Sequence, residues 1–259
     1  MALSLDNLVR KKSDKPPLMI IYGRGKMGKT TLASEFPNPV FIQTEDGSGI
    51  LDIMSFKDEP LSSFEEVNDA LVALASEEHS FQTLVVDSIT QLEPLIWAET
   101  CLRNKWESIE SAGYGKGYIE ADVVWREFLA ACTWLRDNKG MTIILIAHEV
   151  VETFSDPERE DYSKYKMRLH KRAEAMVRER ADIVGFINQV VMLDKGKTGR
   201  DAAKAKGSGQ RALHLNPRPS FEAGNRYDMP DQILINPGQG YDALAPYMPS
   251  HRPAAAEAA

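Results

Sequence analysis

The chain has 259 residues, of which 43% are hydrophobic and 27% charged, a composition typical of a folded globular protein rather than a disordered or fibrous one. Its net charge of −7 alone argues against a general nucleic-acid binder, and its two cysteines, Cys101 and Cys132, do not imply a disulfide framework. The first residues hold no signal-peptide core and no apolar run could span a membrane, so we expect a cytoplasmic protein.

The first predicted strand, Leu18–Tyr22, runs into a glycine-rich turn and then into a helix that ends near Phe36. Residues 23–30 fit the pattern G-x-x-x-x-G-K-[ST] of a phosphate-binding loop. In such a loop the backbone N–H groups surround the β-phosphate, Lys29 reaches the β- and γ-phosphates, and the Thr30 hydroxyl holds Mg²⁺. We therefore predict ATP and Mg²⁺ as cofactors, with nucleotide contacts from Gly23, Arg24, Gly25, Lys26, Met27, Gly28, Lys29, Thr30 and Thr31.

The same glycines also fit the dinucleotide fingerprint G-x-G-x-x-G, and the acidic pair Glu45-Asp46 follows at a suitable distance. A dinucleotide site has no use for Lys29 and Thr30 directly after the last glycine, whereas a triphosphate site needs both. We favour the triphosphate site over the dinucleotide site and over the other alternative, a glycine turn that binds no ligand.

Strands and helices are then expected to alternate along the chain. The predicted strands cover residues 40–44, 81–88, 141–147, 183–193 and 211–215. The predicted helices cover residues 62–76, 91–110, 120–138 and 169–181, with a glycine-rich break at 113–118. Residues 149–168 are charged and poorly patterned, so we expect a loop, and residues 195–209 are expected to form a hairpin tip.

This alternation predicts an α/β fold with a mostly parallel central sheet and helices on both faces. We expect a lead-in over residues 1–16, one domain over 17–235, and an extension over 236–259 that is disordered at its end.

Three predicted strands end in residues with functional side chains, and ligands of such sheets bind at these ends. Asp87 follows a buried strand, where it could complete the Mg²⁺ shell or cap the next helix. Glu45 could activate water, with Asp46 as the competing residue, or belong to a turn. His148 could sense the γ-phosphate or be structural.

The phosphate loop at residues 23–30 and the segments at residues 41–47, 85–88 and 144–148 resemble those of the RecA-like ATPases in order and spacing. The resemblance covers roughly residues 16–232. The resemblance implies a RecA-like fold, makes Glu45 the catalytic carboxylate beside Lys29 and His148, and implies assembly into a ring or filament. The compact length resembles short phage-type members that anneal single-stranded DNA in the host cytoplasm, for which a single-strand binding protein is a candidate partner. Residues 223–230 are similar to a motif of the RadA branch, so Arg226 is expected to reach the nucleotide of a neighbouring subunit, although Gly224 replaces the motif's lysine.

The resemblance also implies two DNA-binding loops, one at residues 113–118 and one after His148. Residues 151–218 contain 15 Lys and Arg against 10 Asp and Glu, which gives this region +5 and the remainder −12. Such a region indicates either an anionic partner or a solvated surface. The predicted DNA contacts are Tyr114, Lys116, Tyr118, Lys164, Lys166, Arg168, Lys171 and Arg172.

The leading hypothesis is an ATPase that binds single-stranded DNA and promotes annealing or recombination. A nucleotide-dependent protein–protein switch or loader without its own DNA binding is the alternative. A dinucleotide-dependent oxidoreductase is a third hypothesis, for which we find no hydride-transfer site.

Overall fold

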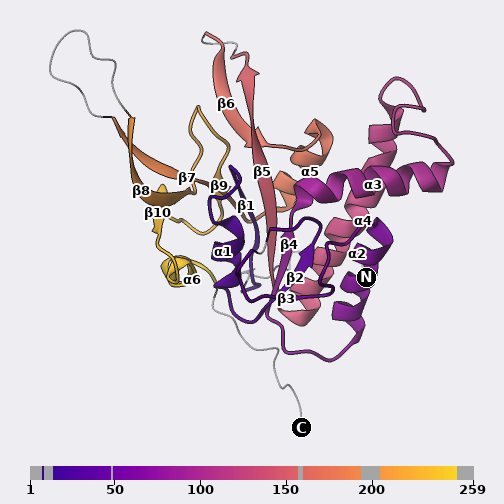
Figure 1. Ribbon diagram of the computed structural model, residues 1–259, viewed down its shortest axis with the longest axis horizontal. Helices are drawn as coiled ribbons and strands as arrows, with labels where there is room; N and C mark the ends of the chain where they lie inside the picture. The colour runs from indigo at the N-terminus through magenta and orange to yellow at the C-terminus, as the bar shows by residue number, and fades with distance from the viewer. Residues whose placement is uncertain (1–7, 9–13, 48, 157–159, 194–204, 250–259) are drawn as a thin grey trace.

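The computed structural model describes residue 8 and residues 14–47, 49–156, 160–193 and 205–249 (Figure 1). Its centre is a sheet with the strand order β10-β8-β7-β1-β5-β4-β2-β3. The strands from β7 to β3 pair in parallel, and β8 and β10 are antiparallel additions at one edge. The predicted α/β fold with a mostly parallel central sheet is confirmed.

Strands and helices are interspersed along the chain. The strands are β1 (Leu18–Gly23), β2 (Pro39–Gln43), β3 (Met54–Ser55), β4 (Thr83–Asp87), β5 (Thr142–Phe154), β6 (Tyr162–Met167), β7 (Ile183–Leu193), β8 (Ala205–His214), β9 (Gly224–Asn225) and β10 (Gln232–Ile235). The helices are α1 (Lys29–Ser34), α2 (Phe64–Ser76), α3 (Ile89–Asn104), α4 (Lys116–Lys139), α5 (Lys171–Arg180) and α6 (Gly240–Leu244), followed by a short 3₁₀ turn, Ala245–Tyr247.

Two hydrophobic cores lie on the two faces of the sheet because successive strand residues point to opposite sides. Leu18, Ile20 and Tyr22 of β1 pack with α2, α3, α4 and α5. Met19 and Ile21 belong to the opposite core, which includes α1 and Leu244 of α6. The central strands are buried on both faces, as expected for parallel strands between helical layers.

Two antiparallel hairpins extend beyond the edge of the sheet at which β1 ends (Figure 1). One is formed by β5 and β6, which pair from Glu149–Met167 to Phe154–Tyr162. The predicted loop at 149–168 is therefore wrong, since most of it is this hairpin. The other is formed by β7 and β8, and most of the hairpin tip predicted at 195–209 lies outside the described residues.

Helix boundaries differ from the predictions at the α3–α4 connection. α3 ends at Asn104, where Lys105 adopts the left-handed conformation, rather than at residue 110. α4 begins at Lys116, so part of the predicted glycine-rich break is helical.

The chain after residue 235 packs against the domain up to residue 249. The Glu35 carboxylate accepts backbone hydrogen bonds from Gly238, at 2.7 Å, and from Gly240. Residues 236–249 of the predicted extension thus contact the domain, and residues 250–259 lie outside the described part. In that described part, no helix is both long and apolar enough to cross a membrane.

Candidate nucleotide-binding site

The phosphate loop connects the buried strand β1 to α1, as predicted. Lys26 (φ 63°) and Gly28 (φ 81°) both take the left-handed conformation, which glycine adopts without strain. The Lys29 ammonium is buried inside the loop and donates to the carbonyl oxygens of Gly23 (2.9 Å) and Arg24 (3.0 Å). Burial lowers the pKa of Lys29, and nearby Asp87 and Glu45 oppose this shift. The Lys29 ammonium is thus held inside the loop, where a phosphate would bind.

Thr30 and Asp87 meet at the end of the sheet, although 57 positions separate them. The Thr30 hydroxyl donates to Asp87 Oδ2 at 2.6 Å. A Cβ added at Gly47 would lie 3.7 Å from that Asp87 oxygen and 3.9 Å from the Thr30 hydroxyl, so the turn after β2 closes over the pair. Burial raises the pKa of Asp87, because desolvation disfavours the charged carboxylate, although the hydrogen bond from Thr30 opposes the rise.

This pair fits the predicted Mg²⁺ site. Mg²⁺ prefers oxygen ligands and is commonly held by one or two protein groups together with substrate phosphates and water. Thr30 and Asp87 supply one hydroxyl and one carboxylate beside the phosphate loop. A bound cation would also relieve the burial of Asp87.

Glu45 and His148 form a hydrogen-bonded pair beside the loop, across 103 positions of sequence. Glu45 Oε1 lies 2.7 Å from His148 Nε2, and each side chain is about a fifth exposed, at 23% and 22%. Burial acts to raise the pKa of Glu45, but the contact with His148 and a hydrogen bond with Ser88 lower it overall, so this carboxylate is held ionised. Asp46, the competing residue, is exposed. The geometry favours Glu45 over Asp46 as a group that could accept a proton from water.

His148 is placed at this site by strand pairing. It lies opposite Gly23, the first residue of the phosphate loop, in the parallel β1–β5 register. Its backbone N–H donates to the Thr90 hydroxyl at 2.9 Å, and its carbonyl accepts from the Arg168 N–H at 2.8 Å. His148 therefore stands where β5 leaves the sheet and enters the β5–β6 hairpin.

Arg211 also contacts the phosphate loop, and this contact was not predicted from the sequence. Its Nη1 donates to the Met27 carbonyl oxygen at 3.1 Å. Arg211 lies on β8, 184 positions from Met27, in a region whose many cations do not reveal which one turns toward the nucleotide site. A signal would have required the β7–β8 register, which the sequence alone does not give.

The predicted DNA contacts do not form one free basic surface. Arg172 is paired with Asp122, with the shortest contact at 2.5 Å, while Lys164 pairs with Glu222 at 2.6 Å. Two further predicted contacts, Lys166 and Tyr118, also have partners within the protein.

Lys166 lies 3.3 Å from Glu152, and the Tyr118 ring stacks on His170 with centroids 4.2 Å apart. The Tyr118 hydroxyl donates to Glu110. The remaining predicted contacts have exposed side chains; they are Tyr114, Lys116, Arg168 and Lys171.

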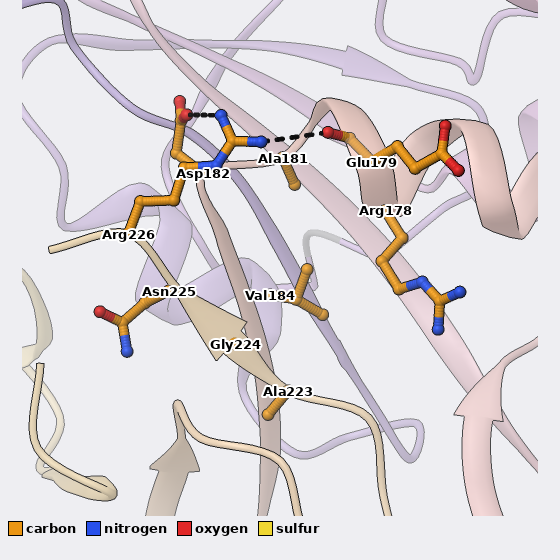
Figure 2. Close-up of a pocket in the computed structure, with 9 residues that line it drawn as sticks. All are labelled: Arg178, Glu179, Ala181, Asp182, Val184, Ala223, Gly224, Asn225 and Arg226. Atoms are coloured by element: carbon orange, nitrogen blue, oxygen red, sulfur yellow. Dashed lines mark hydrogen bonds and ion pairs between the residues drawn. The ribbon is translucent and has the colours of Figure 1, made fainter. Parts of the chain in front are cut away.

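Arg226 lies at the opposite end of the sheet from the phosphate loop. Its backbone N–H donates to the Asp182 carbonyl, and the Asp182 N–H donates to the carbonyl of Leu18, the first residue of β1. Its guanidinium contacts Asp182 Oδ1 at 3.0 Å and the Glu179 carbonyl at 3.3 Å (Figure 2). At about 3.3 Å per residue, the length of β1 separates Arg226 from Gly23 by roughly 17 Å. Arg226 cannot act on the nucleotide of its own chain, and only a contact to a neighbouring copy remains as a prediction.

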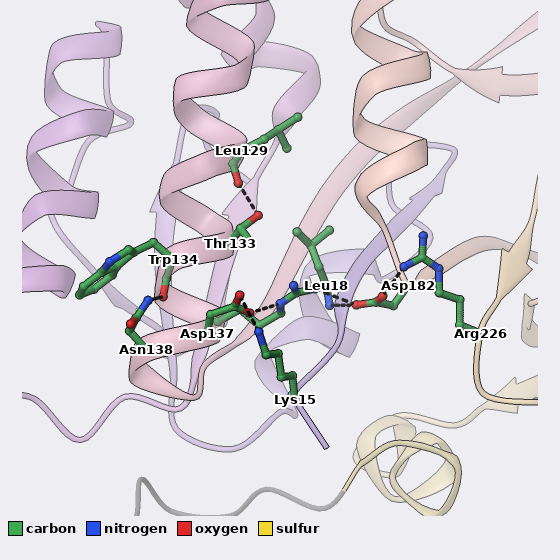
Figure 3. A network of polar contacts seen from close by, with 10 residues as sticks. Lys15, Leu18, Leu129, Thr133, Trp134, Asp137, Asn138, Asp182 and Arg226 are labelled. Carbon is green, nitrogen blue, oxygen red and sulfur yellow. Dashed lines mark hydrogen bonds and ion pairs between the residues drawn. The ribbon is translucent and has the colours of Figure 1, made fainter. Parts of the chain in front are cut away.

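Asp182 organises this opposite end. Its Oδ2 accepts from the Leu18 N–H at 3.0 Å and from Arg136 Nη1 at 3.2 Å, in addition to the Arg226 contact at Oδ1 (Figure 3). Lys15 pairs with Asp137 nearby at 2.7 Å. This network gives Arg226 a structural role within one chain.

Comparisons with known proteins identify relatives of this chain. A prophage-derived uncharacterized protein of Bacillus subtilis (strain 168), YorG, is 26% identical over 179 residues, which are 66% of this chain and 50% of that protein. The chain thus spans about half the length of this curated relative. Among solved structures, the RadB recombinase has a TM-score of 0.48 at 15% identity and covers 85% of this chain and 87% of its own.

The AAA domain family matches residues 15–227, which include the phosphate loop, Asp87 and His148. This match covers most of the chain, and it agrees with the RecA-like P-loop proteins that the motifs resemble. The chain therefore belongs to the AAA domain family.

Proposed function

We propose that the protein is a Mg²⁺-dependent ATPase that binds single-stranded DNA and promotes annealing or recombination. The observation that carries the ATPase part is the convergence of three features at one edge of the sheet. These are the phosphate loop with Lys29 inside it, the Thr30–Asp87 pair, and the Glu45–His148 pair.

Each of these three features has a role in hydrolysis. Lys29 would leave its carbonyl partners and neutralise phosphate charge, while Thr30 and Asp87 would hold Mg²⁺, which stabilises the charge developing on the transferred phosphoryl group. Glu45, held ionised by His148, would orient a water molecule and accept its proton. A substrate group that forms its own hydrogen bond with His148 would release Glu45 from this contact and leave it available to water.

His148 could also relay nucleotide binding to the β5–β6 hairpin. The His148 ring contacts Glu45, and the His148 carbonyl accepts a hydrogen bond from the Arg168 N–H, directly after β6. A movement of the ring would therefore be transmitted to the segment that follows the hairpin. Arg168 and Lys171 are exposed in this part of the chain and are the candidate phosphate contacts, with Tyr114 as a candidate stacking residue.

The test of the ATPase is hydrolysis by the full chain with Mg²⁺, with and without single-stranded DNA. Lys29→Ala and Glu45→Gln should each slow hydrolysis by roughly a hundredfold or more, because each removes a group that acts on the reacting phosphate or water. Asp46→Asn is the matched control and should retain the wild-type rate within about twofold. A Glu45→Gln protein that hydrolyses ATP at the wild-type rate would remove Glu45 from the mechanism.

A nucleotide-dependent protein–protein switch is the second candidate, favoured by a specific observation. Lys164, Lys166 and Arg172 are engaged in ion pairs, and the chain carries a net charge of −7. Binding of a labelled single-stranded oligonucleotide, measured with a non-hydrolysable ATP analogue over a salt series, separates the two functions.

The DNA-binding proposal expects affinity that falls with salt and that weakens when Arg168 and Lys171 are changed together to alanine. Arg218→Ala is the control, because Arg218 is also exposed. No ATP-dependent DNA binding, with hydrolysis intact, would favour the switch.

A further inference from the structure

Arg211 reaches the phosphate loop from β8, a strand that is not next to β1 in the sheet. β7 lies between them, yet the Arg211 guanidinium lies against the loop at Met27 and Gly28. A Cβ added at Gly28 would be 1.7 Å from Arg211 Nη1 and 3.0 Å from its Cζ. The guanidinium therefore occupies the space that any larger residue at position 28 would need.

The β7–β8 hairpin contacts the loop at its beginning as well. A Cβ added at Gly23 would lie 2.4 Å from the Ile187 carbonyl oxygen on β7. Gly23 and Gly28 are the two defining glycines of the motif, so the base of this hairpin touches both ends of the loop. Just beyond, the β7–β8 register shifts between Gln189 and Val191, which marks where the hairpin departs from regular pairing.

The bonding of Arg211 leaves most of its hydrogen-bonding capacity unused. A guanidinium has five N–H donors in a planar fork that fits phosphate oxygens. In the described part of the chain its one hydrogen-bond acceptor is the neutral Met27 carbonyl, and no carboxylate neutralises it. A cation held against a loop whose amides bind anions will gain a stronger partner when a phosphate enters.

We propose that Arg211 is a second cation for the nucleotide phosphates, supplied by the same chain as Lys29, and that it couples the β7–β8 hairpin to nucleotide occupancy. The inference rests on the proposed nucleotide binding and names a residue of that site. On binding, the guanidinium exchanges the Met27 carbonyl for a phosphate oxygen. The base of β8 follows it and becomes more tightly held.

The test measures the affinity of the full chain for MgATP and MgADP by competition with a fluorescent nucleotide over a salt series. Arg211→Gln should weaken both by roughly ten- to a hundredfold, the range for a lost charged hydrogen bond, and should flatten the salt dependence. Arg211→Lys keeps the charge and should lose less. Arg218→Gln, at an exposed position, should match the wild type within about twofold.

Two further readouts separate phosphate contact from simple bracing of the loop. A brace would act only through the hydrogen bond to the Met27 carbonyl, so its loss in Arg211→Gln would lower the melting temperature of the nucleotide-free protein without affecting the salt dependence. A phosphate contact instead leaves the melting temperature of the nucleotide-free variant near that of the wild type. It also predicts that MgADP slows amide exchange in Ala205–His214 in the wild type but not in Arg211→Gln.

Wild-type affinity and salt dependence in Arg211→Gln, when the wild type binds ATP, would overturn this inference alone. Absence of nucleotide binding by the wild type itself would overturn the proposed function and this inference together.

Discussion

Glu93 is a buried carboxylate on α3 whose ionisation should control stability above neutral pH. It is 6% exposed, and both of its oxygens accept from the backbone N–H of His170 at 3.0 Å, at the start of α5. Burial raises its pKa from 4.5 to about 7, although the hydrogen bond from His170 opposes the rise. Replacing Glu93 with glutamine keeps the shape and one acceptor but removes the ionisable group.

The sign and size of the effect follow from linkage. Because the folded pKa lies above the unfolded one, ionisation favours the unfolded chain, so stability is lost as the pH rises through 4.5 to about 7. At about 1.4 kcal/mol per pKa unit, the buried charge costs roughly 3 kcal/mol at pH 8 and about 1 kcal/mol at pH 5.

We therefore expect Glu93→Gln to be more stable than the wild type at pH 8, by up to about 3 kcal/mol, and the difference to shrink toward pH 5. Urea unfolding at pH 5, 6, 7 and 8 measures it. Glu120→Gln, at an exposed position of α4, is the control and should follow the wild type at every pH. A Glu93→Gln protein with the same pH dependence as the wild type would refute the reasoning, since Glu93 would then not titrate in this range.

Two other substitutions test the geometry of the nucleotide site. Asp87→Asn should raise the Mg²⁺ concentration needed for half-maximal hydrolysis by roughly tenfold or more, because it removes a charged ligand; an unchanged Mg²⁺ requirement would contradict the role of Asp87. Gly23→Ala should lower the thermal stability of the nucleotide-free protein, because its Cβ would meet a backbone oxygen of Ile187 at 2.4 Å. Gly25→Ala is the matched control, with nothing within 4 Å of the added Cβ, and equal melting temperatures for the two variants would contradict the packing of β7 on the loop.

The parts of the fold that bury apolar surface could be predicted from the sequence. β1, β4 and the sheet portion of β5 are continuous apolar runs, so their positions and their parallel pairing followed from composition and from the alternation with helices. The phosphate loop was predictable because its chemistry fixes residue types at short spacing. Asp87 and His148 could be placed near it because parallel strands end at one edge.

The β5–β6 hairpin could not be predicted for a physical reason. Beyond Glu149 its strands project from the sheet, so neither face is consistently buried and the period-two apolar pattern is missing. Its charged side chains satisfy one another across the ladder, as Lys166 and Glu152 do at 3.3 Å. Such pairs look like a basic, DNA-binding stretch when the sequence is considered without its pairing.

The partners of charged side chains on elements far apart in the sequence could not be predicted either. The Asp122 partner of Arg172 and the Met27 partner of Arg211 depend on packing and register between distant elements. Local pattern identifies the charges but not which of them remain available for a ligand. The availability of Arg168 and Lys171, and the contact of Arg211, are consequences of the folded chain.

The proposed function depends on a triphosphate binding where β1 turns into α1. Titration calorimetry of the full chain with MgATP, for the wild type and Lys29→Ala, tests it most directly. We expect one nucleotide to bind per chain and Lys29→Ala to weaken this binding by roughly a hundredfold or more. The melting temperature of Lys29→Ala should be unchanged or raised, because a buried ammonium is removed. Absence of wild-type binding to ATP, or equal affinity in both proteins, would contradict it.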